Sequence, residues 1–175
     1  MNKSEWIALG ALVVSLFSAF LSALSYLVSR SAHKISKQQH KERYKGIVPY
    51  LVDAFKWSSE EDFYISFALR FTNEATISNS LQNIELHLEY YDRNKHCGKA
   101  KISPSLEVKP INLAEASEML KIPLEMNSKS AKSGWISFKL PNLFYEDLEI
   151  DLYKIVATTT DGRIIAVETH IVNIV

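Results

Sequence analysis

Cysteine and glycine are scarce in this sequence, and their scarcity excludes several classes of protein. Cys97 is the only cysteine among 175 residues, so the chain forms no intramolecular disulfide and suits a reducing compartment. The five glycines never cluster, which excludes a dinucleotide-binding fingerprint and a phosphate-binding P-loop. The hydrolase motif G-x-S-x-G and the zinc-protease motif H-E-x-x-H are also absent from the sequence. We therefore expect a protein that is not an enzyme and that uses no cofactor.

An excess of basic residues is also missing, because the net charge of the chain is zero. The balance is nevertheless uneven along the chain. Residues 1–45 carry seven Lys and Arg against two Glu, a charge of +5, and residues 46–175 carry thirteen against eighteen acidic residues, a charge of −5. An acidic domain lacks the basic surface typical of nucleic-acid binders. We expect no double-stranded nucleic acid among the partners.

One long apolar run is present near the start of the chain. Between Glu5 and Arg30 there are 24 uncharged residues. As a helix they would extend about 36 Å, enough to cross a hydrocarbon core of about 30 Å. A cleaved signal peptide would have a shorter apolar stretch preceded by basic residues. Residues 1–29 are therefore predicted to form a single transmembrane anchor.

Small residues recur on one side of this predicted helix at steps of three and four. They are Ala8, Ala11, Ser15, Ser18, Ser22, Ser25 and Ser29. In lipid, a face of small residues lets two helix backbones approach closely, so we interpret this set as an oligomerisation seam and expect a homo-oligomer. The alternative is that the hydroxyl groups bond back to carbonyls of their own helix and that the alignment is accidental.

A basic segment, residues 30–45, follows the apolar run and contains no Gly or Pro, so the helix is expected to continue until Gly46. Its basic residues are Arg30, Lys34, Lys37, Lys41, Arg43 and Lys45. They either bind anionic lipid at the membrane surface or form a solvated stalk. The positive-inside rule places the N-terminus outside the cell and residues 46–175 in the cytoplasm, on a plasma or inner membrane.

The hydrophobic period changes to two after Pro49, which is typical of strands. The predicted strands are residues 50–57, 63–72, 84–90, 120–126, 136–140, 149–160 and 163–175, with an eighth near 106–108. Asp161-Gly162 is a hairpin signal between the last two strands. Residues 92–99 are predicted to be a polar loop, and Trp57 and Trp135 to lie in the core. The chain is thus predicted to be mainly β, with an antiparallel immunoglobulin-like sandwich of seven or eight strands after the anchor.

The sequence also resembles a known group of domains. The resemblance rests on Phe-Ala-Leu-Arg-Phe-Thr-Asn (67–73), Asn-Ser-Leu-Gln-Asn-Ile-Glu-Leu (79–86), Ile-Pro-Leu (122–124) and Ser-Gly-Trp-Ile-Ser-Phe-Lys-Leu-Pro (133–141). With the closing Thr-Asp-Gly hairpin, this succession resembles the small immunoglobulin-like domains of uncharacterised bacterial membrane-anchored proteins. The resemblance covers residues 63–175. It implies a fold and brings no catalytic residues with it.

Few residues outside the anchor are candidates for a site. Leu143, Phe144 and Tyr145 place two aromatic rings in a predicted loop, where they form a partner-binding surface or cap the open end of the sandwich. His96 and Cys97 supply fewer ligands than a zinc site needs. The acidic residues of 60–62 and of 146–151 lack the spacing of a calcium loop. No metal site is predicted.

These features indicate a membrane-anchored, self-associating, non-enzymatic interaction or sensor module with an unknown protein partner or small ligand. The alternative is a ligand-gated membrane effector, as in antiviral defence, that senses a cyclic nucleotide and whose oligomerised helices permeabilise the membrane. Scattered candidates for its phosphate site are Lys56, Arg70, Lys99, Lys101 and Lys139.

Overall fold

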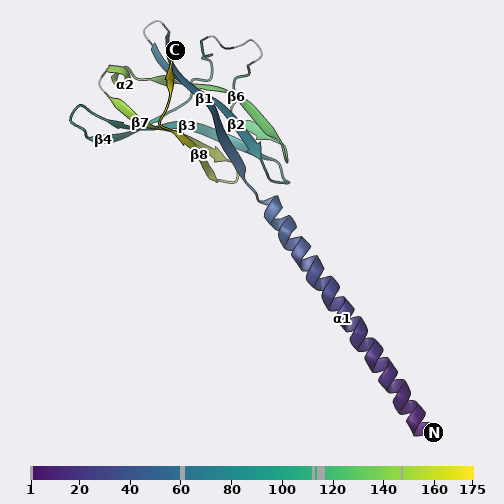
Figure 1. The fold of residues 1–175 in the computed structure, drawn as a ribbon. Helices are drawn as coiled ribbons and strands as arrows, with labels where there is room; N and C mark the ends of the chain where they lie inside the picture. The colour runs from purple at the N-terminus through teal and green to yellow at the C-terminus, as the bar shows by residue number, and fades with distance from the viewer. Residues whose placement is uncertain (1, 60–61, 112, 114–116, 147) are drawn as a thin grey trace. The chain divides into compact units, whose positions relative to one another are not determined.

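The computed structural model describes residues 2–59, 62–111, 113, 117–146 and 148–175, except for the side chains of Glu5, Ala8, Tyr145 and Glu146. The chain consists of two compact units, Met1–Arg43 and Tyr44–Val175. Within the described residues it is mostly β, with one long N-terminal helix and two sheets (Figure 1).

The first unit is the helix α1, Lys3–Arg43. Its 41 residues make it about 60 Å long at 1.5 Å per residue. The part from Leu9 to Arg43 is long and apolar enough to cross a membrane, although a signal sequence near the N-terminus would meet the same criteria. The helix continues beyond the apolar run through the basic residues and ends shortly before Gly46.

The second unit contains the strands. They are β1 (Ile47–Ser59), β2 (Asp62–Asn73), β3 (Asn79–Tyr91), β4 (Cys97–Ile102), β5 (Leu124–Met126), β6 (Ala131–Leu140), β7 (Glu149–Thr159), β8 (Ile164–Thr169) and β9 (Asn173–Ile174), with a short helix α2 (Leu143–Glu146) before β7. One sheet has the order β6-β2-β1-β9. The other has the order β4-β3-β7-β8, and β5 pairs with β3 outside this path.

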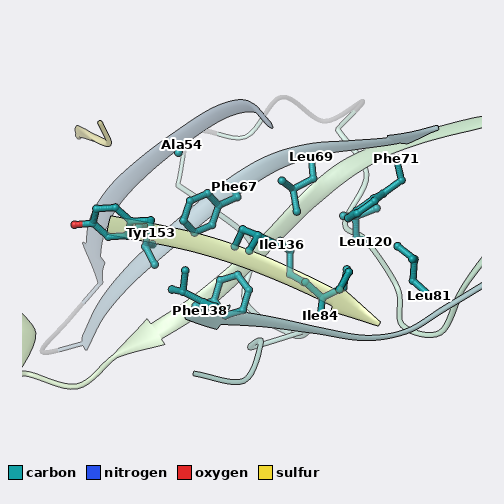
Figure 2. Packing of buried hydrophobic residues seen from close by; sticks show 14 of the residues in the cluster. Ala54, Phe67, Leu69, Phe71, Leu81, Ile84, Leu120, Ile136, Phe138 and Tyr153 are labelled. Atoms are coloured by element: carbon teal, nitrogen blue, oxygen red, sulfur yellow. The ribbon is translucent and has the colours of Figure 1, made fainter. Parts of the chain in front are cut away.

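A single core cluster is built from the inward side chains of both sheets (Figure 2). On β2, the alternating residues Ile65, Phe67, Leu69 and Phe71 are each fully buried, as their period of two predicts. Phe67 packs edge-to-face on Phe138 of β6, with ring centroids 5.9 Å apart. The other sheet contributes mainly aliphatic residues from β3 and β7 to this cluster.

Two described parts of the long connection between β4 and β5 bond to the outer edge of β6. The Ser105 amide donates to the Ser137 carbonyl, and the Trp135 amide donates to the Glu118 carbonyl, both at 2.8 Å. The strand expected near residues 106–108 is wrong, because a turn lies there, closed by a bond from the Val108 amide to the Ser105 carbonyl. The strand expected over 120–126 is reduced to β5, the three residues Leu124–Met126.

The polar loop predicted over residues 92–99 is also wrong in its second half, because β4 begins at Cys97. This strand pairs with the C-terminal half of β3 and alternates between exposed and half-buried residues. Only Ala100 and Ile102 pack against the core. The first two half-buried residues of this edge strand, Gly98 and Ala100, are small, so its hydrophobic pattern is weak and the sequence did not indicate a strand there.

The last predicted strand is divided in two by the structure. The hairpin at Asp161-Gly162 is present, with Gly162 at φ +77° and the Thr159 amide bonded to the Arg163 carbonyl. β8 then ends at Thr169, whose hydroxyl accepts a bond from the Ile171 amide at 3.1 Å. After this turn, β9 joins the other sheet and runs parallel to β1. The expectation of a purely antiparallel arrangement is therefore wrong at this strand pair.

Candidate functional site

A cavity of about 400 Å³ opens at the end of the β unit that carries α2. Its lining comes from β1, β2, β6, α2, β7 and the C-terminal segment. The lining residues are Lys56, Trp57, Ser58, Phe63, Tyr64, Leu140, Phe144, Leu148, Glu149, Ile150, Ile174 and Val175. Apolar and aromatic side chains predominate in this set, as is usual for cavities that hold small ligands.

A β-bulge in β1 brings Lys56 to this cavity. The pairing register of β1 with β2 shifts between Leu51 and Asp53. Before the bulge, odd-numbered residues such as Ile47 face the core. After the bulge, even-numbered residues such as Ala54 face it. Lys56 is opposite Ile65, a core residue, and opposite residues share a face of a sheet. The lysine stem is therefore placed on the core-facing side.

The same bulge turns Trp57 to the other face of the sheet. Trp57 is opposite Tyr64, and their rings stack with centroids 4.7 Å apart. Trp57 is buried, yet it does not belong to the cluster between the sheets. Trp135 is only half-buried and meets Phe55 edge-on at 5.3 Å. The predicted burial is therefore confirmed for Trp57, although on the outer face of its sheet, and the prediction is wrong for Trp135.

Of the described residues that line the cavity, Lys56 is the one basic residue. Its Nζ lies 5.2 Å from the ring centre of Tyr153, a favourable position for a cation. Burial lowers the pKa of the Lys56 amine and raises the pKa of the Tyr153 phenol to about 12. Among the described residues, no carboxylate forms an ion pair with Lys56. The lysine therefore faces the cavity with its charge uncompensated by a described acidic group.

The segment 143–145 forms most of α2 and lies beside this cavity. Phe144 is half-buried, packs against the core cluster and meets Tyr90 edge-on at 5.1 Å. Leu143 is 54% exposed, and the side chain of Tyr145 lies outside the described part of the structure. Phe144 thus closes the end of the sandwich, while Leu143 is available at the surface.

In α1, the described seam residues Ala11, Ser15, Ser18, Ser22, Ser25 and Ser29 are exposed within the single chain. The side chain of Ala8 lies outside the described part. Ser31 bonds back to the Leu27 carbonyl at 3.0 Å, but within residues 2–43 none of the five seam serines forms such a bond.

The basic residues that follow are also exposed, namely Arg30, Lys34, Lys37, Lys41, Arg43 and Lys45. Lys45 lies beyond the end of α1, and its Nζ is 3.9 Å from a carboxylate oxygen of Glu74. It therefore belongs to the second unit, as Glu74 does.

The structure does not bring together the basic residues that were candidates for a phosphate-binding site. Lys139 pairs with Asp62 at 2.6 Å, and the hydrogen bond between them lowers the pKa of Asp62. Lys99 is bonded to Glu89 on the other sheet. Lys56 lines the cavity beside α2, whereas Arg70 lines a different one together with Asp53 and Glu118.

In the described part of the chain, no group of three or more His, Cys, Asp or Glu residues is placed to hold a metal ion. The His96 ring bonds to the Asp92 carboxylate at 3.0 Å, and Cys97 is exposed. The His96 amide lowers the pKa of Asp92 by a hydrogen bond. Of the acidic groups noted in the sequence, residues 60, 61 and 147 and the side chain of Glu146 lie outside the described residues.

Comparison with known proteins gives only distant structural similarity. No protein family matches the sequence, and no curated protein does so. An ApaA protein from Bordetella pertussis is similar at 8% identity, with a TM-score of 0.35 over 73% of this chain and 93% of that one. A structural genomics target, SoR45, is similar at 10% identity, with a TM-score of 0.29 over 70% of this chain and 77% of that one.

Proposed function

We propose that the protein is a membrane-anchored, self-associating, non-enzymatic interaction or sensor module. The observation that carries this proposal is the exposure of α1. Its large apolar side chains, from Trp6 to Val28, are between 43% and 74% exposed in the single chain. A helix that is apolar on all sides is stable only when lipid or other helices surround it.

Self-association is supported by the side of α1 that carries Ser15, Ser18, Ser22, Ser25 and Ser29. Small side chains allow close packing of helices in lipid, and a hydroxyl that is not bonded to its own helix can bond to a neighbouring one. The absence of such internal bonds at these five serines, in the described helix, supports the seam over an accidental alignment.

The orientation follows from charge. The basic residues from Arg30 to Lys45 follow the apolar run, so the positive-inside rule places the β unit in the cytoplasm of a plasma or inner membrane. Each basic residue near an anionic leaflet gains about 1 kcal/mol. Anionic lipid is therefore the membrane partner of this segment.

The β unit is in this proposal an immunoglobulin-like sandwich. The orders β6-β2-β1 and β4-β3-β7-β8 support it, because β2 and β3 lie in different sheets, as do β6 and β7. Such crossings between two sheets that share one core are typical of Greek-key sandwiches. This fold presents loops for binding and does not itself imply catalysis.

Self-association is tested by cross-linking the full chain in membranes. Replacing Ser18, Ser22 and Ser25 together with Leu keeps the helix apolar but puts bulky side chains on the seam. The cross-linked oligomer is expected to fall markedly, while membrane insertion is retained.

The matched control replaces Leu16, Phe20 and Leu27 with Ala, which changes three residues and leaves the seam intact. This variant is expected to retain the oligomer. Equal loss in both variants, or no loss in either, contradicts the seam. Loss of membrane potential on expression of the full chain contradicts a module that only binds partners and supports the gated membrane effector instead.

A further inference from the structure

We propose that the cavity beside α2 binds a small monocarboxylate with an apolar body, and that Lys56 is the counter-ion of the carboxylate. This inference gives the proposed sensor module its ligand class. It concerns binding by the β unit alone and does not depend on whether the helices associate.

The first argument is the position of Lys56. A charged amine that is half-buried has lost part of its hydration, and a charge-assisted hydrogen bond to an anion compensates for that loss. Its present neighbour is the face of the Tyr153 ring, which supplies a weak electrostatic attraction and accepts no strong hydrogen bond. Figure 2 shows Tyr153 at one end of the core cluster, with its hydroxyl directed away from the other labelled side chains.

The second argument is the character of the walls. Phe63 and Phe144 supply two rings on the core-facing side, where Lys56 lies, and the stacked pair of Trp57 and Tyr64 lines the cavity from the other face of β1 and β2. The volume of about 400 Å³ lies within the range of about 300 to 1,000 Å³ that is typical of small-molecule sites. An aromatic or short aliphatic body would bury its surface against Phe63, Phe144 and Ile150 while its charged end reaches Lys56.

The third argument limits the charge of the ligand. Glu149 also lines the cavity and is exposed. Its carboxylate would repel a dianion such as a phosphate monoester more strongly than a monoanion. Among the described lining residues the charges of Lys56 and Glu149 oppose each other, so a dianion gains little net attraction to offset its larger desolvation cost, which favours a single carboxylate group over a phosphate.

Binding is tested on the full chain in nanodiscs of phosphatidylcholine, with indole-3-acetate as the probe and indole-3-acetamide as its neutral counterpart. Hexanoate and hexanamide form a second, aliphatic pair. The three tryptophans give three indole N–H signals in NMR spectra, and the Trp57→Phe variant identifies the signal from the cavity wall. At least one acid is expected to shift the Trp57 signal saturably and to bind about tenfold or more tightly than its amide.

Two variants distinguish the effect of the Lys56 charge from the effect of the apolar cavity walls. Lys56→Met retains the apolar stem and is expected to abolish the preference for the acid over the amide. Lys101→Met, at an exposed position of β4, is expected to preserve it. The proposal is overturned if neither acid shifts the Trp57 signal, if acid and amide bind equally to the native chain, or if Lys56→Met retains the preference. The comparison of acid with amide on the native chain requires no variant to fold.

Discussion

Trp57 donates a hydrogen bond of 2.8 Å from Nε1 to Oγ of Ser66, and both side chains are buried although they lie on the face of the sheet turned away from the core cluster. The Ser66 hydroxyl is also bonded to the Ser137 hydroxyl at 2.9 Å. This chain of two bonds joins β1, β2 and β6. It fixes the indole that forms one wall of the cavity.

Removing the acceptor of this bond should destabilise the β unit. Ser66→Ala leaves a buried indole N–H without a partner, which costs about 1–3 kcal/mol of the free energy of unfolding. Urea denaturation of the full chain in detergent, followed by fluorescence, measures the loss. In a Trp57→Phe background no N–H remains to be satisfied, so the same substitution should cost clearly less. An equal cost in both backgrounds would show that the bond is not the cause.

Asn73 should be among the least replaceable polar residues of the β unit. Its buried amide donates to the carbonyls of Ile77 and Asn127 and accepts from the Ala75 amide. Asn73→Ala leaves several backbone groups without partners, and we expect a loss of more than about 2 kcal/mol in thermal or urea unfolding.

The control for this prediction is Asn79→Ala, because the Asn79 side chain donates one exposed bond of 3.2 Å to Asp161 and accepts only a local bond from the amide of the next residue, Ser80. Its effect should remain within about 0.5 kcal/mol. A comparable loss in the two variants would contradict the assigned role of Asn73.

Tyr153 should make the β unit sensitive to alkali. Burial raises its pKa from 10.0 to about 12 in the folded chain, so the folded state favours the neutral phenol. The stabilisation of the folded state by this difference in pKa is fully present below pH 10, the pKa of the phenol in the unfolded chain. It is lost as the pH rises towards 12. A spectrophotometric titration should show one late tyrosinate transition that Tyr153→Phe lacks. If that transition persists in the variant, it belongs to another tyrosine.

Cys97 reports the orientation of the chain without any added residue. It is exposed in β4, at the edge of its sheet. A membrane-impermeant maleimide should label it only after lysis of the cells, because the positive-inside rule places the β unit in the cytoplasm. Labelling of intact cells would place the β unit outside.

The β unit should fold without the helix. All nine described strands and the whole core cluster lie in Tyr44–Val175, and about 130 residues are sufficient for one hydrophobic core. Circular dichroism of the fragment from Gly46 should show β structure with little helix. A helical spectrum would contradict the independence of the unit.

Periodicity predicted the parts of the fold whose burial is regular. Ile65, Phe67 and their neighbours alternate over a long stretch, because β2 lies inside a sheet with one face on the core. The start of β4 has no such signal, since its inward residues are small. The division between β8 and β9 depends on the turn held by Thr169, which hydropathy does not encode.

The candidate site was predictable only in part. Two adjacent aromatic residues in an expected loop drew attention to Phe144, which does line the cavity. Lys56 could not be assigned this place, because simple alternation continues through β1 and takes no account of the bulge between Leu51 and Asp53. The same bulge explains why Trp57 is buried on the unexpected face.

The connection between α1 and β1 has a consequence for partner binding. The helix ends at Arg43 and the first strand begins at Ile47, so three residues join them. They span at most about 11 Å, even when fully extended. Copies of the helix that pack together in a membrane would therefore hold their β units at a high effective concentration, in the millimolar range typical of short tethers. A partner with two binding sites would then be retained through avidity, even if each single contact were weak.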